Sequence, residues 1–363
     1  MAITAELWQA NLIALISAFV AIKVLRPIAI YFGLVDVPKG RKQHVGHIPL
    51  IGGLSVYIGV LVAILAVFPI HDKLFYLLAS ASLILMAGLV DDLKDLGAWV
   101  RILIQTLACV IMIKGTGVYV DDLGNLLGLG QMSLGIVGIP FTIFAVIGLV
   151  NAINMSDGID GLTGSLALVA IIGIFGFQTL SGNYRLFDFL LIMAAALMPY
   201  LLTNLRIISR RKIFLGDAGS MFIGFVLAWV LIELSQGQGT SRQALQPVNV
   251  IWCVALPVID TLVVIIKRMK SGRSPFSPDR SHFHHVLQDR GLSSRKTLAV
   301  ILMIAFGLVF IGWLIQLLMP IVAVPTFVVI TFGYMHWVRK NGWHHGTVQD
   351  RSFEDQTAVN RSK

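Results

Sequence analysis

The sequence predicts an all-α, polytopic integral membrane protein with about eleven transmembrane helices. Of its 363 residues, 56% are hydrophobic and only 13% are charged, and the mean hydropathy is +0.83. A soluble globular domain carries roughly twice this fraction of charged residues. Apolar segments of roughly 17 to 25 residues, long enough to cross a bilayer as helices, recur along the whole chain. These observations exclude a water-soluble globular protein.

The expected helices follow the apolar segments in order. They are 7–25, 49–70, 74–90, 100–114, 134–150, 163–179, 187–203, 218–234, 248–267, 298–318 and 320–338. Because these segments run from one end of the chain to the other, we expect residues 1–340 to form one membrane domain, followed by a polar tail, 341–363. Lys23 and Arg26 lie at the C-terminal end of the first segment and just after it, instead of preceding it. We therefore expect a retained first helix and not a cleaved signal peptide.

Basic residues predict the orientation, since Lys and Arg are concentrated in cytoplasmic connections. With eleven helices, 24 of the 28 Lys and Arg residues fall in the connections after the odd-numbered helices and in the tail. An error of one helix would scramble this separation, so the split also supports the helix count. We expect the N-terminus outside the cytoplasm and the C-terminus inside it.

The net charge and the cysteines exclude two other kinds of site. A charge of +9 in a polytopic protein indicates a basic cytoplasmic surface that faces anionic lipid, so we expect no nucleic-acid partner. Cys109 and Cys253 both lie inside apolar segments, where a free thiol behaves as a small hydrophobic group. They predict neither a disulfide nor a metal site.

A polar turn with two glycines separates the fifth and sixth expected helices, at 151–163. Asp157 and Asp160 are three residues apart and would share one face of a helical turn. Gly158 and Gly161 would let the backbone approach a ligand closely. This combination suits a metal-bound phosphate, and the alternative is an ordinary Asn/Asp/Gly loop.

Asp91 and Asp92 lie at the inner end of the third expected helix. One adjacent carboxylate could reach a metal ion while the other faces a substrate, and a cation or basic neighbour would keep both ionised. The alternative is a solvated helix boundary. A second pair, Asp121 and Asp122, is expected on the opposite side of the membrane, and we assign it no chemistry.

The segment 214–220 directly precedes an apolar helix. Small residues before a helix N-terminus provide free N–H groups and a positive dipole end, which suit phosphate oxygens. Asp217 adds a hard oxygen ligand for Mg²⁺. The alternative is that Ser220 is a simple N-cap.

Three histidines, His282, His284 and His285, end the long inner connection after the ninth helix. We expect Asp279 or Ser281 to cap a short helix there. Because this connection contains no cysteine, we favour hydrogen-bond donors to a pyrophosphate over zinc ligands. Within the ninth helix, Asp260 is an intramembrane carboxylate and a candidate by default, which we interpret as a structural partner.

Together these motifs resemble the polyprenyl-phosphate N-acetylhexosamine-1-phosphate transferases. The motifs are Asp91–Asp92, Asn154 with Asp157 and Asp160, Gly216-Asp217-x-Gly-Ser220, and His282-x-His-His285. The resemblance covers essentially the whole chain. Within this family, one segment is similar to that of the branch that initiates O-antigen and enterobacterial common antigen. The segment is Ser-Pro-Phe-Ser-Pro-Asp-Arg-Ser-His-Phe-His-His, residues 274–285. The branch that forms lipid I, the alternative, carries three consecutive histidines, which Phe283 interrupts here.

The resemblance implies an enzyme of the bacterial inner membrane, with a periplasmic N-terminus and a cytoplasmic active site. It would transfer an N-acetylhexosamine 1-phosphate, by default that of N-acetylglucosamine, from a UDP-sugar to undecaprenyl phosphate and release UMP. Mg²⁺ would be the cofactor, with Mn²⁺ as a substitute, and a homodimer is common in the family. We favour direct attack by the lipid phosphate over a covalent aspartyl intermediate, since a phosphate is already ionised near pH 7.

The resemblance also implies roles for individual residues. Asp217 would be the principal Mg²⁺ ligand with Asp91 or Asp92 nearby, and the other member of that pair would be base or nucleophile. The remaining expected assignments are Asn154, Asp157 and Asp160 for uridine and diphosphate, Phe214 for uracil, His282, His284 and His285 for pyrophosphate, and Arg101 with Lys94 for the lipid phosphate.

Two other classes of protein remain open. A secondary transporter is also apolar and polytopic, but its polar residues should cluster near mid-membrane on broken helices. A structural membrane protein needs no converging carboxylates.

Overall fold

Helices make up nearly all of the regular structure. The computed structural model describes residues 5–37, 46–126, 128, 130–236, 244–275 and 281–341. The α-helices are α1 (Ala5–Phe32), α2 (Gly52–Val67), α3 (Asp72–Lys94), α4 (Ala98–Thr116), α5 (Gly138–Met155), α6 (Leu162–Ser181), α7 (Phe187–Asn204), α8 (Gly216–Ser235), α9 (Pro247–Cys253), α10 (Ala255–Lys270), α11 (Phe283–Asp289), α12 (Ser294–Leu318) and α13 (Ala323–Asn341). Two-residue strands β1 (Val35–Asp36) and β2 (Ile48–Pro49) form an antiparallel ribbon, and 3₁₀ turns precede α5 and α13.

The predicted membrane class is confirmed. Within the described residues, nine helices are long and apolar enough to cross a bilayer, and the bent pair α9–α10 adds a tenth. The remaining expected span, 49–70, corresponds to α2, whose 16 residues extend about 24 Å at 1.5 Å per residue. This is shorter than the roughly 30 Å hydrocarbon core of a bilayer. The expected 49–70 span was therefore too long at both ends, and its first residue, Pro49, belongs to β2.

The ninth expected span is not a single helix. The chain bends by 82° between α9 and α10, at Val254. Pro257, three residues further on, cannot donate a backbone hydrogen bond, and its ring would clash with the carbonyl group of Cys253 in a continuous helix. The prediction of a continuous helix over 248–267 was thus wrong, and the proline explains the break.

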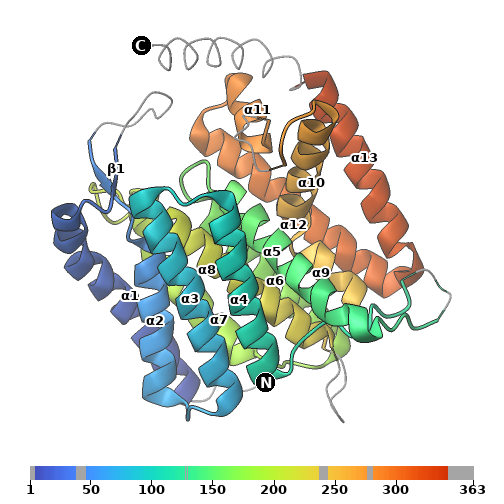
Figure 1. The fold of residues 1–363 in the computed structure, drawn as a ribbon, viewed down its shortest axis with the longest axis horizontal. Coiled ribbons are helices and arrows are strands. Elements are labelled where there is room, and N and C mark those ends of the chain that lie inside the picture. The colour runs from blue at the N-terminus through green and yellow to red at the C-terminus, as the bar shows by residue number, and fades with distance from the viewer. Residues whose placement is uncertain are drawn as a thin grey trace.

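Helix α8 is the centre of the bundle, and its membrane-crossing segment is completely buried between α2, α3 and α5 (Figure 1). Two glycines allow neighbouring helices to approach its first turn. A Cβ atom on Gly53 would lie 2.0 Å from the Cα atom of Gly219, and one on Gly88 would lie 2.3 Å from the Cα atom of Ala218. The first turn of α8 is therefore held tightly by α2 and α3.

Connections that are distant in sequence meet at one end of the bundle. The ribbon β1–β2, the turn between α3 and α4, and α11 all lie at the upper end in Figure 1. The backbone N–H of Phe214, just before α8, donates to the carbonyl group of Pro49 over 2.9 Å. The polar tail from residue 342 and the basic residues Lys39, Arg41 and Lys42 lie outside the described residues.

Candidate active site

Asp92 binds the N-terminus of α8. Its Oδ1 accepts the backbone N–H of Asp217 over 2.8 Å, and its Oδ2 accepts that of Ala218 over 3.2 Å. The first N–H groups of a helix have no partner within the helix, and the positive end of the helix dipole favours an anion there. A carboxylate from α3 thus caps α8. Ser220, the cap considered from the sequence, instead lies inside α8.

Asp91 is buried beside Arg101 and Asp217. Its Oδ2 accepts a hydrogen bond from the guanidinium group of Arg101 over 2.9 Å, and its Oδ1 accepts the backbone N–H of Leu96 over 2.6 Å. The side chain of Asp91 is 1% exposed, whereas that of Arg101 is 28% exposed. The guanidinium group has five N–H donors, so Arg101 can pair with Asp91 and still face a second anion.

Asn154 connects the turn after α5 to Asp217. Its Nδ2 atom donates to Asp217 Oδ1 over 2.8 Å and lies 2.9 Å from Ser220 Oγ. The side chain of Asp217 also lies within hydrogen-bonding reach of the Asp91 carboxyl group. Asp217 also lies within electrostatic range of Asp91, Asp92 and Asp157. Carboxylates from three connections therefore surround one helix terminus.

The described residues contain no group of three or more His, Cys, Asp or Glu side chains arranged to hold a metal ion. Mg²⁺ does not require such a cage, because it usually keeps several water ligands and binds one or two carboxylates. Asp217 and Asp91 repel one another, and a divalent cation between them would remove that repulsion. These oxygen ligands therefore fit Mg²⁺.

The turn between α5 and α6 contains two carboxylates in different surroundings. Asp157 is half-buried, and desolvation raises the pKa of this carboxyl group to about 7. Asp160 pairs with Lys212, whose Nζ atom lies 2.5 Å from Asp160 Oδ1 and 4.3 Å from the ring centroid of Phe214. Lys212 thus joins the turn to the segment that precedes α8.

The histidine segment lies against the same turn. A Cβ atom on Gly158 would lie 1.9 Å from His284 Nε2, so the missing side chain at Gly158 makes room for the imidazole ring. The rings of His282 and His284 are stacked with centroids 6.0 Å apart, and those of His284 and His285 are 4.1 Å apart. The short helix expected here is present as α11, but its N-cap is His282 and not Ser281. Asp279 lies outside the described residues.

Most of the residues singled out in the sequence therefore lie in one region. The exception is Lys94, which is exposed at the end of α3, and no contact among the described residues joins it to the carboxylates. The second aspartate pair lies at the other end of α8, where Gln236 Oε1 accepts the backbone N–H groups of Asp121 and Asp122. Both cysteines are free and buried, as predicted.

Three residues that the structure places here had no predicted site role. Lys212 belongs to a basic run, Arg210-Arg211-Lys212, that the positive-inside rule already explains. Arg268 and Tyr334 lie in membrane helices and contact His282 and Asp260. Arg268 is only 2% exposed, and burial of a charged side chain would have indicated a site. The sequence does not show this burial, because it depends on where the helix ends.

Comparison with known proteins supports a single family. The family model described as glycosyl transferase family 4 matches residues 74–235. A protein from Yersinia pestis is 39% identical over 293 residues, which cover 80% of this chain and 79% of the relative. A protein from Haemophilus influenzae is 39% identical over 302 residues, 83% and 84% of the two chains. One from Escherichia coli (strain K12) is 35% identical over 294 residues, 80% and 79%.

All three relatives bear the name undecaprenyl-phosphate alpha-N-acetylglucosaminyl 1-phosphate transferase. Their identity to this chain extends over about four-fifths of each sequence, beyond the region that the family model matches. The chain, with its carboxylates gathered at the start of α8, therefore belongs to glycosyl transferase family 4.

Proposed function

We propose that the protein transfers N-acetylglucosamine 1-phosphate from UDP-N-acetylglucosamine to undecaprenyl phosphate. The observation that carries this proposal is the convergence of Asp91, Asp92 and Asn154 on Asp217 at one end of the bundle. A site of this composition suits a cation-bound diphosphate. The names of the relatives supply the identity of the sugar and the lipid.

In the proposed reaction, an oxygen of the lipid phosphate forms a bond to the β-phosphorus of the UDP-sugar. The bond from that phosphorus to the bridging oxygen breaks, and UMP leaves with the bridging oxygen. The products are undecaprenyl-diphosphate-sugar and UMP. Because the attacking phosphate is already ionised near pH 7, we propose direct attack without a covalent protein intermediate. The residues then contribute mainly positioning and charge stabilisation.

Asp217 and Asp91 would hold Mg²⁺, and Mn²⁺ could replace it. When bound, the ion would neutralise charge on the diphosphate oxygens. Asn154 orients Asp217 by occupying its Oδ1 atom. Asp92 keeps the start of α8 in place, since both of its oxygens accept backbone N–H groups. We therefore propose that Asp92 acts through the position of Asp217 and that Asp91 faces the acceptor.

The donor would lie along the turn between α5 and α6. Phe214 offers an aromatic face for the uracil ring, and Lys212 offers a positive charge beside Asp160. His284, which lies against Gly158, and its neighbour His285 would donate hydrogen bonds to the diphosphate. On the other side of Asp217, Arg101 would bind the phosphate of the lipid, because its guanidinium group is partly exposed beside Asp91.

We propose a cytoplasmic site in the bacterial inner membrane, since the donor is a cytosolic nucleotide sugar. The basic connections at this end of the bundle favour that orientation. A homodimer belongs to the same proposal. The lipid I-forming reaction is the second transferase candidate, and Phe283, which interrupts the run of histidines, disfavours it.

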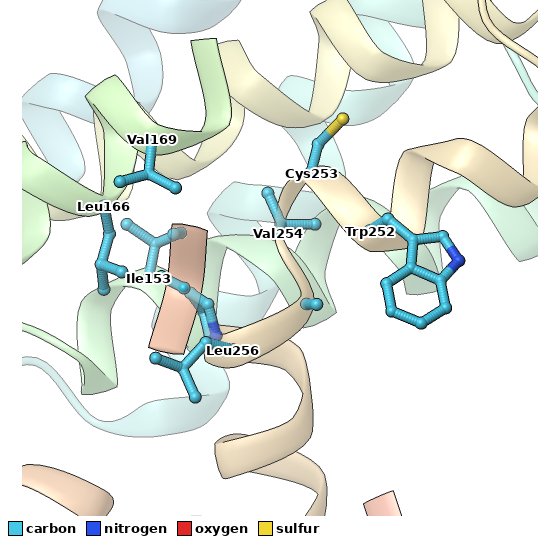
Figure 2. Close-up of a pocket in the computed structure, with 10 residues that line it drawn as sticks. Ile153, Leu166, Val169, Trp252, Cys253, Val254 and Leu256 are labelled. Atoms are coloured by element: carbon cyan, nitrogen blue, oxygen red, sulfur yellow. The ribbon is translucent and has the colours of Figure 1, made fainter. Parts of the chain in front are cut away.

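The site argues against a secondary transporter. Transport sites usually lie where broken helices expose polar groups near mid-membrane. Here the recess at the break between α9 and α10, about 260 Å³ including space open to the outside, is lined by residues with apolar side chains, among them Ile153, Leu166 and Val169 (Figure 2). The aspartates that surround Asp217 lie instead at helix ends.

A purified-protein assay tests the proposal directly. Protein in detergent would be incubated with undecaprenyl phosphate, Mg²⁺ and one of several UDP-sugars, and UMP release and lipid-linked sugar would be measured. We expect UMP release that depends on the lipid phosphate, is fastest with UDP-N-acetylglucosamine, stops with excess EDTA and returns with Mg²⁺. Full activity in EDTA would refute the metal role, and release of UMP without acceptor would refute direct attack.

A further inference from the structure

One buried carboxylate in α10 binds three hydrogen-bond donors near the histidine segment. Asp260 is 5% exposed. Its Oδ2 lies 2.8 Å from His282 Nδ1. Its Oδ1 accepts the backbone N–H of Phe283 over 3.0 Å and the hydroxyl group of Tyr334 over 2.5 Å. Asp260 therefore joins α10, the start of α11 and α13.

The two neighbours of the His282 ring specify the same tautomer. A carboxylate can only accept, so the proton beside Asp260 belongs to Nδ1 of His282. On the other side of the ring, Nε2 lies 3.5 Å from the guanidinium group of Arg268, which can only donate. The neutral Nδ1–H tautomer satisfies both contacts, and the Nε2–H tautomer satisfies neither.

Aromatic packing holds the same segment from the side of α13. The ring of Phe283 lies 5.5 Å from that of Tyr334 and 5.5 Å from that of Trp337, both nearly edge-on. The guanidinium group of Arg290, just after α11, lies over the Trp337 ring, 5.1 Å from its centroid. The residue that interrupts the run of histidines thus anchors α11 to α13.

We propose that Asp260 is a positioning residue for the transfer reaction, which acts by fixing the tautomer and orientation of His282. This inference rests on the proposed function. His282 stacks on His284, and His284 lies against Gly158, so the orientation of the first ring determines how the histidines face the donor diphosphate. Tyr334 supports Asp260 from α13.

Asp260→Asn is the informative change, because an amide has one acceptor oxygen and cannot satisfy three donors. We expect kcat to fall roughly 10- to 100-fold, the usual scale when the partner that orients a functional histidine is removed. Tyr334→Phe removes one donor and leaves the carboxylate, so we expect a fall of roughly 3- to 10-fold, as for a single hydrogen bond. KM for the UDP-sugar should change less than kcat in both.

A double-mutant cycle separates positioning from general stability. In a His282→Ala background, Asp260→Asn and Tyr334→Phe should lower kcat no further, since the group on which they act is gone. An equal fall in both backgrounds would overturn the proposal. Glu233→Gln is the matched control, because Glu233 is also a buried carboxylate in a membrane helix but pairs with Arg185 at the opposite end; its kcat should equal that of the parent.

A second measurement does not depend on activity. Nitrogen-15 NMR of histidine-labelled protein, with His282→Ala to assign the signal, should show His282 as the Nδ1–H tautomer in the parent and should show loss of that signal in Asp260→Asn. An Nε2–H tautomer in the parent overturns the inference even if transfer is confirmed. The expected tautomer in a parent that releases no UMP would refute the function alone.

Discussion

Two Asp-Asp pairs lie at opposite ends of the same helix and do different things. Asp91 and Asp92 use their carboxylate oxygens, which accept N–H groups from Arg101 and from the first turn of α8. Asp121 and Asp122 use their backbone N–H groups, which donate to Gln236 just after the end of α8. The same dipeptide thus contributes carboxylates at one end and main-chain hydrogen bonds at the other.

The difference teaches that the contacts of a carboxylate, and not its presence, indicate chemistry. Asp122 Oδ1 accepts the N–H of Gly124 two residues away, so this side chain stabilises its own loop. Asp92 reaches 125 residues along the chain to Asp217. A long-range contact of this kind brings catalytic candidates together, whereas a local contact shapes a turn.

The largest expected effect comes from Asp217→Asn. The amide would weaken a hard oxygen ligand and remove a negative charge, so we expect UMP release to fall by about 10³-fold, the order for losing one element of transition-state charge stabilisation. Asp121→Asn is the control, because the contacts of that residue with Gln236 use its backbone, and it should retain parental activity. Comparable losses in both variants would remove the distinction between the two ends.

Asp92→Asn tests the cap on α8. The two N–H groups of Asp217 and Ala218 lie on different oxygens of Asp92, so the amide would set an NH₂ donor against one of them. The charge at the helix terminus is also lost, so we expect destabilisation of about 1–2 kcal/mol. Cys109 and Cys253 are buried and free, so a thiol-reactive dye can report thermal unfolding. Asp122→Asn should shift the midpoint less, because an amide oxygen can still accept from Gly124. Equal midpoints for Asp92→Asn and the parent would show that the cap does not stabilise α8.

The sequence was sufficient to predict the helix ends at which these aspartate pairs lie. Charge separation and hydropathy predicted which connections share a side, because both depend on the bilayer and not on packing. The bend at Val254 was missed, although Pro257 was visible, because prolines within α1 and α7 leave those helices continuous. Whether a proline breaks a helix depends on its neighbours.

Site partners that depend on three-dimensional contact could not be predicted. Nothing in the sequence pairs Lys212 with Asp160 or Asp260 with Tyr334, since these contacts cross 52 and 74 residues. The cap that Asp92 forms on α8 could not be predicted either, because a helix cap is normally predicted from the residue next to the helix in sequence. Membrane topology therefore predicts which residues lie on one side of the bilayer, whereas the packing of the helices determines which of them form contacts.

Lys212→Met sharpens the comparison by testing the donor side of the inner end. Methionine keeps much of the packing against Phe214 but loses the charge beside Asp160, a pair of about 1 kcal/mol at a partly exposed site. We expect KM for UDP-N-acetylglucosamine to rise about 5-fold with kcat nearly unchanged. Arg210→Met, in the same exposed connection, is the control. A fall in kcat at constant KM would place Lys212 outside donor binding.

The smallest expected effect is the pH dependence of Asp157. Burial raises the pKa of this carboxyl group to about 7, whereas in an unfolded chain it is near 3.9. The folded state binds this proton more tightly than the unfolded chain does. The protonated Asp157 therefore contributes its full stabilisation below about pH 4, and this contribution is lost as the pH rises through about 7. Tryptophan fluorescence during thermal unfolding in EDTA should therefore show a midpoint that falls over this range.

Asp157→Asn should flatten that dependence, because an amide does not titrate, and Asp122→Asn at the other end of α8 should keep the parental slope. Mg²⁺ should also reduce the slope in the parent, since a nearby cation favours the ionised carboxylate. If Asp157→Asn keeps the full slope, another group is responsible for it. If Mg²⁺ has no influence on the slope, Asp157 lies too far from the ion for its charge to affect the carboxyl group. The cation would then bind Asp217 and Asp91 without a contribution from the turn between α5 and α6.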